Sequence, residues 1–263
     1  MDNWRSAITM VDVNRIIVRG HDLVSLMQHG TYGDVVALLL GGHRPDEGER
    51  RLIEAILIGI ADHGAGAPST ATARLAASGN RKAPEAAVAA GILAIGDAHA
   101  GAGEACMRII AGALERAARE SRSIVDVARA TASEAHAAGR RLPGLGHRVH
   151  SKDPRTTVLF RIADEYGKAG PGIAFMRALE SAVADTIKPL PVNVDGAIAA
   201  VLYDLGYPPA AAKLIFIVGR SAGLAAHVME EYTRERPMRV RIPVVYDGPA
   251  PVEDEDQVER VNG

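Results

Sequence analysis

The sequence predicts an all-α fold, and three observations support that prediction. Aromatic residues make up only 4% of the 263-residue chain, whereas alanine is abundant. β-Branched residues seldom form the alternating runs that half-buried strands require. Apolar residues instead recur at helical spacing between glycines and prolines that suit helix ends. With 48% apolar and 24% charged residues, the chain has the composition of a soluble protein with a sizeable core.

The predicted elements follow one another in this order. A short extended segment at 15–19 precedes a helix that Asp22 caps and Gly30 ends, and a second helix runs from Tyr32 to the glycine pair at 41–42. Asp46 opens a helix over 47–61 with one apolar stripe. Further helices are expected over 84–95, 104–119, 156–167, 173–185, 196–205 and 208–232, the last broken near the glycines at 219 and 223. A polar stretch at 121–138 leads to a glycine-rich turn, and 239–246 is expected to be an edge strand.

Net charge and cysteine content limit the classes of binding partner and the cellular compartment that we expect. Thirty basic and 32 acidic side chains give a formal charge of -2, which argues against nucleic acid or an anionic membrane as a partner. No apolar run approaches the ~20 residues that cross a bilayer. Cys106 is the single cysteine, so no intrachain disulfide can form. With no export signal apparent near the N-terminus, we expect a cytoplasmic protein.

Polar residues among glycines and apolar residues mark the candidate site. They lie in ADHGAGAPST (His63), IGDAHAGAGEA (His99), LPGLGHRVHSKDPR (His147), VNVDGAIAAVL (Asp195) and VGRSAGLAAHVMEE (Arg220 and His227). Each also has an ordinary structural explanation: the histidines as helix-end residues, Asp195 as a helix cap and Arg220 as an ion-pair residue. A buried arginine, however, needs a partner or an anionic ligand.

Most known metal and phosphate motifs are absent from the sequence. The HxxH spacing of His147 and His150 lacks the further residues of a zinc site, so no metal is expected. Neither a phosphate-binding GxxxxGK[ST] nor a GxSxG nucleophile motif occurs. The remaining imidazoles, carboxylate and arginines suit carbon–carbon chemistry next to a thioester, where a base, an enolate-stabilising donor and carboxylate-binding arginines are needed.

The ordered motifs resemble those of the citrate synthase superfamily. GLGHRVHSKDPR resembles its glycine-His-Arg loop, and NVDG followed by VGRSAGLAAHVMEE resembles its catalytic aspartate and substrate arginine segments. IVRGHDLVSLM, YGDVVALLLGGHRP, ADHGAGAPSTATAR and IGDAHAGAGEA occur upstream in the family order, so the resemblance covers roughly residues 8–249. A single helix joins two segments that full synthases separate by several, which resembles the compact citryl-CoA lyase type and the lyase module of ATP-citrate lyase. His99 departs from that module and matches the synthases.

The resemblance implies a role for each site residue. Asp195 would be the acid or base at the acetyl carbon, His147 would hydrogen-bond the oxaloacetate carbonyl or citryl hydroxyl, and His99 would stabilise the enolate. The implied ligands of the substrate carboxylates are His63, Arg148, Arg220 and a C-terminal arginine, often from the partner subunit, that is either Arg236 or Arg239.

Coenzyme A would enter as part of the substrate, with no tightly bound cofactor. The backbone around Leu145 and Gly146 would receive its adenine or pantetheine arm. Its phosphates would contact Lys188 and either Lys152 or Arg155, although these cations are equally explained as solvated surface residues. His227 remains open between a structural and a functional role.

The sequence therefore predicts a citryl-CoA lyase that forms acetyl-CoA and oxaloacetate. Two alternatives stay open: a citrate or 2-methylcitrate synthase, and a non-catalytic helical subunit that binds acyl-CoA. A large helical domain (1–140 and 196–249) and a smaller mobile segment (141–195) would enclose the cleft, and residues 250–263 would form an acidic tail. We expect a homodimer or higher homo-oligomer, with a separate citryl-CoA synthetase as the source of substrate.

Overall fold

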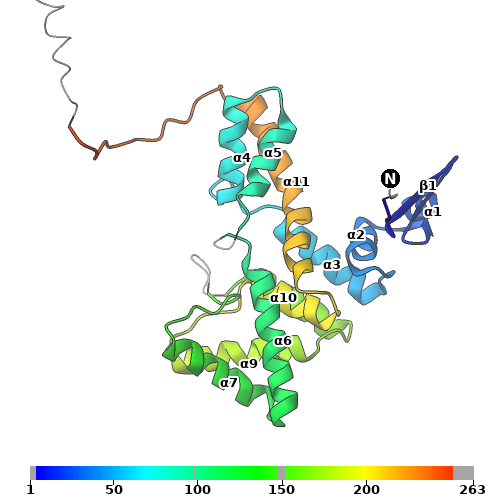
Figure 1. Cartoon of the computed structure of the whole chain (residues 1–263), viewed down its shortest axis with the longest axis vertical. Coiled ribbons are helices and arrows are strands. Elements are labelled where there is room, and N and C mark those ends of the chain that lie inside the picture. The colour runs from blue at the N-terminus through cyan, green and yellow to red at the C-terminus, as the bar shows by residue number, and fades with distance from the viewer. Residues whose placement is uncertain (1–3, 97–98, 147–151, 251–263) are drawn as a thin grey trace, which may run out of the picture.

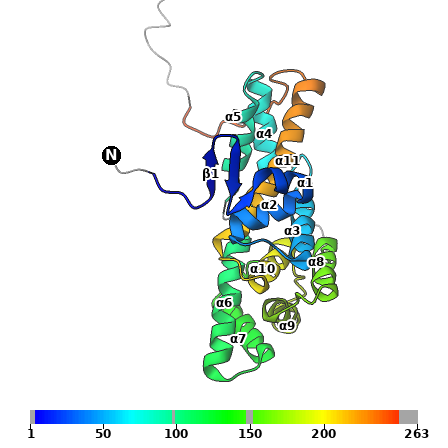
Figure 2. The ribbon, with the colours of Figure 1, turned by 90° about the vertical axis from the view of Figure 1, so that its right-hand side faces the viewer.

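The computed structural model describes residues 4–96, 99–146 and 152–250, and it confirms the all-α prediction. Eleven helices and one small sheet form the described part of the chain. The helices form a lower body, a three-helix layer above it and a side arm that ends in the sheet (Figure 1). The same vertical order is visible after a quarter turn (Figure 2).

The side arm is the N-terminal part of the chain. Strands β1 (Thr9–Asp12), β2 (Arg15–Val18) and β3 (His21–Asp22) form an antiparallel meander, so the extended segment predicted near residue 15 is confirmed. Helix α1 (Leu23–His29) begins at its predicted cap Asp22, and α2 (Tyr32–Gly41) begins at a Thr31 capping box. Val18, Leu26 and Leu38 form the small core beneath the sheet.

The lower body holds the main hydrophobic core. Its helices are α3 (Glu47–Ile60), α6 (Ala102–Glu120), α7 (Ile124–Ala137), α8 (Pro154–Glu165), α9 (Pro171–Thr186) and α10 (Val194–Asp204). Helix α10 is buried along most of its length, and α6, α8 and α9 pack around it. Because α8 and α9 share this core with α6 and α7, the described residues of 141–195 form no separate core. The division into two lobes remains a prediction.

The upper layer consists of α4 (Pro68–Gly79), α5 (Pro84–Leu93) and the C-terminal half of α11 (Ala210–Arg234). Small residues, mainly alanines, together with Leu224 and Val228 fill the space between these helices. Helix α11 also packs on α3 and α6, so it joins the upper layer to the lower body (Figure 1).

Helix α11 is continuous, and the predicted break at Gly219 and Gly223 is wrong. A Cβ at Gly223 would lie 2.1 Å from the carbonyl oxygen of Ala61. These glycines therefore allow α11 to approach the end of α3 without ending the helix. Within the described residues, α11 alone has the length and composition to cross a membrane, which is weak evidence because its buried residues include Arg220 and Glu231.

Three further predictions need correction. The polar stretch 121–138 contains α7, which begins at a Ser123 cap, and residues 68–79 form α4, to which no helix was assigned. The expected strand at 239–246 is an exposed segment that pairs with no strand in the described part of the chain. Of the expected acidic tail, residues 251–263 lie outside the described residues.

Candidate active site

A cavity of about 420 Å³ lies where the lower body meets the upper layer. Its walls come from the loop between α3 and α4, the segment before α6, the glycine turn before α8, the starts of α8 and α10, and the middle of α11. The lining residues are His63, Gly66, Ala67, Pro68, His99, Ala100, Gly146, Arg155, Asn193, Val194, Asp195, Phe216 and Arg220. The cavity therefore brings together four of the predicted polar residues: His63, His99, Asp195 and Arg220.

Asp195 lies in the first turn of α10 and does not cap it. The cap is Asn193, whose side chain accepts a hydrogen bond from the Gly196 N–H at 3.1 Å. This arrangement leaves the Asp195 carboxylate for the cavity. Burial raises the pKa of Asp195 above its ordinary value, although the Arg155 and Arg220 guanidinium groups oppose that rise. A carboxyl group with a raised pKa is suited to give and take protons near neutral pH.

A tight backbone contact holds the start of α10 beside the glycine turn. The Asn193 N–H donates to the Gly144 carbonyl at 3.0 Å, and the Asn193 side chain donates to the Gly146 carbonyl at 2.8 Å. Gly144 has φ +85°, and a Cβ at Gly196 would lie 2.3 Å from the Gly144 oxygen. Only glycine fits at these two positions, so the glycines of the GLGH and VDG motifs fix the place of Asp195.

The hydrogen bonds of His99 indicate which of its ring nitrogens carries the proton. Its Nε2 lies 3.3 Å from the Ser69 backbone N–H and 2.9 Å from the Ser69 hydroxyl. Because a backbone N–H can only donate, Nε2 accepts and the ring proton lies on Nδ1. Burial lowers the pKa of His99, and the positive charges of Arg220 and His63 lower it further. His99 can therefore donate a hydrogen bond from Nδ1 without carrying a charge.

Arg220 is almost completely buried, with 2% of its surface exposed. Its Nε donates to the Ile60 carbonyl at 2.8 Å, and its guanidinium lies 4.9 Å from the centre of the Phe216 ring. Its Nη1 is buried without a hydrogen-bond partner among the residues that the structure describes. A buried guanidinium nitrogen without a partner is energetically unfavourable, and a ligand carboxylate would satisfy it.

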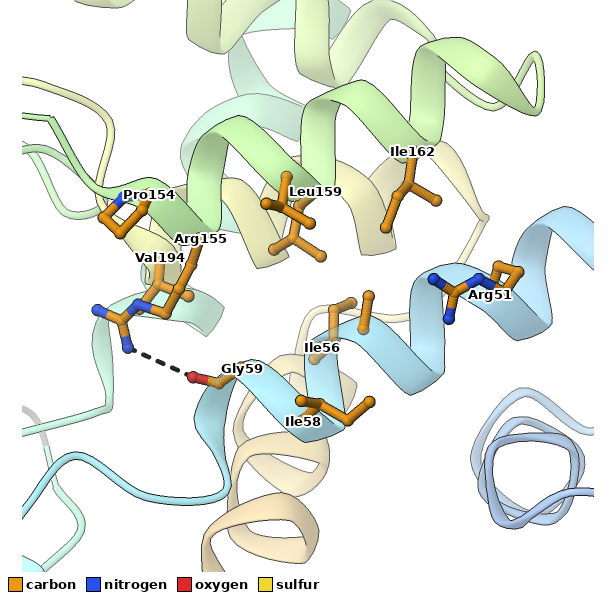
Figure 3. Close-up of a pocket in the computed structure, with 11 residues that line it drawn as sticks. Arg51, Ile56, Ile58, Gly59, Pro154, Arg155, Leu159, Ile162 and Val194 are labelled. Carbon is orange, nitrogen blue, oxygen red and sulfur yellow. Dashed lines mark hydrogen bonds between the residues drawn. The ribbon is translucent and has the colours of Figure 1, made fainter.

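Arg155 is a second guanidinium in the cavity. It was predicted only as an alternative contact for a coenzyme A phosphate. Asp153 holds two of its nitrogens, and its Nη1 lies 3.5 Å from the Gly59 carbonyl at the end of α3. That contact spans a neighbouring apolar groove between α3 and α8 (Figure 3). The sequence feature that could have pointed to Arg155 as a cavity residue is the Asp-Pro-Arg run at 153–155, which follows the glycine-rich turn.

The other predicted residues have different positions. Gly146 lines the cavity, and Leu145 packs on the core beside it. Lys152 and Lys188 are exposed outside the cavity, as is Arg236, which follows α11. His147 and Arg148 lie outside the described residues.

Two residues near the site have structural contacts. His227 hydrogen-bonds Asp62 at 3.0 Å, next to His63, so it supports the loop that carries His63. Arg239, the alternative to Arg236, forms two hydrogen bonds with the buried Glu231 carboxylate. Across the described residues, no three histidine, cysteine or acidic side chains gather as a metal site.

Fold and cavity together define a class: a helical protein whose cavity brings a buried carboxyl group, imidazoles and two guanidinium groups together. Residues 40–241 match the family described as "Citrate synthase, C-terminal domain". The chain belongs to the citrate synthase family.

Known proteins similar to this chain differ in the share of their own length that the match covers. It is 35% identical to citryl-CoA lyase from Hydrogenobacter thermophilus, with a TM-score of 0.86, covering 97% of this chain and 99% of that one. Citrate synthase from Haloferax volcanii is 29% identical over 85% of this chain, which spans 57% of that protein. ATP citrate lyase from Methanosaeta concilii, solved in complex with (3S)-citryl-CoA, shares the fold at 21% identity and a TM-score of 0.78; the match covers 98% of this chain and 43% of that one.

Proposed function

We propose that this protein is a citryl-CoA lyase, which cleaves citryl-CoA into acetyl-CoA and oxaloacetate. One observation carries the proposal: a single cavity holds a carboxyl group whose pKa burial raises, an imidazole whose pKa burial lowers, and a buried guanidinium with a nitrogen that has no partner among the described residues. The match to citryl-CoA lyase over nearly the full length of both chains supports the lyase among the family's activities. Coenzyme A is then part of the substrate.

Substrate binding follows from the charges that face the cavity. Citryl-CoA carries two free carboxylates besides its thioester. The guanidinium groups of Arg220 and Arg155 supply positive charge for them, and His63 lines the same cavity. The planar fork of an arginine fixes the orientation of a carboxylate as well as its position. The carbon–carbon bond would thereby be held near Asp195 and His99.

Cleavage requires that one proton leaves the citryl hydroxyl oxygen and that another is added to the acetyl carbon. A base removes the proton of the citryl hydroxyl; the family resemblance gives this role to His147. The oxygen electrons form the oxaloacetate ketone, and the electrons of the broken carbon–carbon bond form the acetyl-CoA enolate. The Nδ1–H of His99 stabilises the enolate oxygen, and protonated Asp195 gives its proton to the enolate carbon. Burial raises the pKa of Asp195, which favours the protonated form that this step needs.

Condensation of acetyl-CoA with oxaloacetate, or with a related keto acid, is the second candidate function. His99 favours condensation, because a hydrogen-bond donor on the thioester oxygen stabilises the enolate in both directions. The enolate forms from acetyl-CoA in condensation and from citryl-CoA in cleavage. A shared path implies that a lyase of this design also condenses acetyl-CoA and oxaloacetate as a minor activity. Replacement of His99 by alanine should then slow both directions.

The test is a pair of assays on the purified chain without added metal, ATP or nicotinamide: cleavage of citryl-CoA, and condensation of acetyl-CoA with oxaloacetate. Asp195→Asn should lower kcat by ~100-fold or more in the faster direction while binding survives, since an amide cannot transfer the proton. Asp204→Asn, which only alters contacts at the start of α9, is the matched control. Binding of acyl-CoA with turnover in neither direction would instead indicate the non-catalytic subunit.

We also propose that the protein works as a cytoplasmic homodimer, supplied with citryl-CoA by a separate synthetase. Exposed apolar residues on the segment after α11 support self-association: Met238, Val240, Ile242, Val244, Val245 and Tyr246. In such a dimer, Arg236 of one copy would complete the cavity of the other. Mixing inactive Asp195→Asn and Arg236→Ala variants should then restore about a quarter of the activity, because half of the dimers hold one intact site. No recovery, or a monomer in sedimentation, would refute this.

A further inference from the structure

Asp153 is a buried carboxylate that the chemistry above does not use. None of its surface is exposed. Its Oδ1 accepts from the Arg155 backbone N–H and from Arg155 Nε, both at 3.0 Å. Its Oδ2 accepts from Arg155 Nη2 at 2.8 Å and from the Val194 N–H at 3.1 Å. Four donors on one carboxylate satisfy a charge that would otherwise be very unfavourable in the interior.

These four donors come from two different parts of the site. Arg155 projects from the first turn of α8 and lines the cavity, while its remaining nitrogen, Nη1, lies 3.5 Å from the Gly59 carbonyl in the neighbouring apolar groove (Figure 3). Val194 is the first residue of α10 and directly precedes Asp195. One carboxylate therefore fixes the plane of a cavity guanidinium and also the backbone that carries the acid–base residue.

An ordinary helix cap does not require this geometry. Asp204 shows what a structural aspartate does in this fold: it accepts three backbone N–H groups at the start of α9 and contacts no cavity residue. Asp153 caps the start of α8 and also accepts hydrogen bonds from two nitrogens of the Arg155 guanidinium. Such a bidentate pair fixes the orientation of the planar guanidinium group. The side chain of Arg155 is then pre-oriented before any ligand arrives.

We propose that Asp153 is a positioning residue, which aims the Arg155 guanidinium at a substrate carboxylate and holds the first turn of α10 in register with it. The proposal rests on the proposed function, since it assumes that a carboxylate-bearing substrate enters this cavity. Asp153 would affect the binding of di- and tricarboxylates only through Arg155 and the start of α10.

The test measures binding separately from turnover. In the full-length chain, Asp153→Asn removes the charge and keeps the shape. We expect the Kd for oxaloacetate, measured by calorimetry, to rise on the order of 10-fold or more, with a parallel rise in KM for citryl-CoA. Asp204→Asn is the matched control: it should lower Tm and leave both constants unchanged. If Asp153→Asn lowered Tm and changed neither constant, Asp153 would be a helix cap only.

A second comparison shows whether Asp153 acts through Arg155. When Arg155 is already glutamine, adding Asp153→Asn should change the oxaloacetate Kd by less than about twofold, because coupled residues are not additive. Full additivity would overturn the proposal. Should Asp153→Asn fail to fold, Asp153→Glu keeps the charge and displaces the grip by one methylene; an unchanged Kd in that variant would overturn the proposal equally.

Failure of the proposed function gives a different result. A wild-type chain that binds oxaloacetate tightly and turns over neither substrate would refute the lyase, yet the Kd comparison on Asp153 would still decide the positioning role. A wild-type chain that binds no oxaloacetate or citrate would overturn both proposals.

Discussion

Replacing Arg220 by lysine keeps the positive charge of the site but removes the planar guanidinium group with its several hydrogen-bond donors. The Nε of Arg220 donates to the Ile60 carbonyl at 2.8 Å, while its Nη1 is buried beside the cavity without a hydrogen-bond partner among the described residues. Its guanidinium plane also lies 4.9 Å from the centre of the Phe216 ring. A lysine has a single ammonium group, so it can satisfy the carbonyl or reach the ligand, but not both in this geometry.

The size of the effect follows from the contact that is lost. A hydrogen bond to a charged group contributes about 1.5–3 kcal/mol, and burial of Arg220 keeps water from replacing it. Losing one such bond, at about 2 kcal/mol, corresponds to a roughly 30-fold weaker affinity. We therefore expect Arg220→Lys to raise the Kd for oxaloacetate about 30-fold, with little dependence on salt.

Titration calorimetry with oxaloacetate at two ionic strengths measures this effect. Arg81→Lys is a matched control, because Arg81 also donates to backbone carbonyls and lies 5.0 Å from the centre of an aromatic ring, that of Tyr232, but in the upper layer away from the cavity. It should change stability and leave the Kd unaltered. A less than threefold change for Arg220→Lys would show that charge alone anchors the ligand, and the geometric reasoning would be refuted.

Three further predictions concern stability and reactivity. Gly223→Ala should lower the unfolding free energy by about 3 kcal/mol, because its Cβ would strike a carbonyl oxygen at the end of α3; Gly112→Ala, with open space in α6, should raise it by about 0.5–1 kcal/mol in the same denaturant titration. The Glu49 hydrogen bond raises the pKa of His43 above 6.5, so this contact stabilises the fold below that pH and its contribution is lost as pH rises through the folded pKa. The Tm difference between wild type and His43→Gln should shrink between about pH 6 and about pH 9, and a constant difference would contradict it. Burial raises the pKa of Cys106 to about 12, so a thiol reagent should label it only after unfolding, and rapid labelling of the native chain would count against the packing described.

Local sequence signals predicted much of the helical framework. The caps at Asp22 and Asp46 place the starts of α1 and α3 correctly, because a side chain that satisfies free N–H groups acts within one turn. Helix α7 was missed since its polar residues hide a buried alanine face that packs on α9. The glycines of α11 were misread because close approach to another helix leaves the same local signature as a break.

In the candidate site too, the residues were predicted from local motifs, whereas the contacts between distant residues were not. His63, His99, Asp195 and Arg220 were predicted from motifs, and the cavity unites them. The role of Asn193 as the cap that leaves Asp195 free depends on contacts with the glycine turn about fifty residues earlier. The hydrogen bond that fixes the His99 tautomer likewise joins residues thirty positions apart. Periodicity and local motifs carry no information about such pairings.

The unpartnered nitrogen of Arg220 also has a consequence for the lifetime of the protein. Without a ligand, the folded chain carries a buried cationic nitrogen that water reaches in the unfolded state. A metabolite that binds there favours the folded population by mass action, by about 2.7 kcal/mol at a concentration 100 times its Kd. Because proteases act on the unfolded fraction, scarcity of di- and tricarboxylates would shorten the survival of the protein in the cell, and abundance would extend it. Supply of the metabolite would thus control the amount of this protein as well as its occupancy.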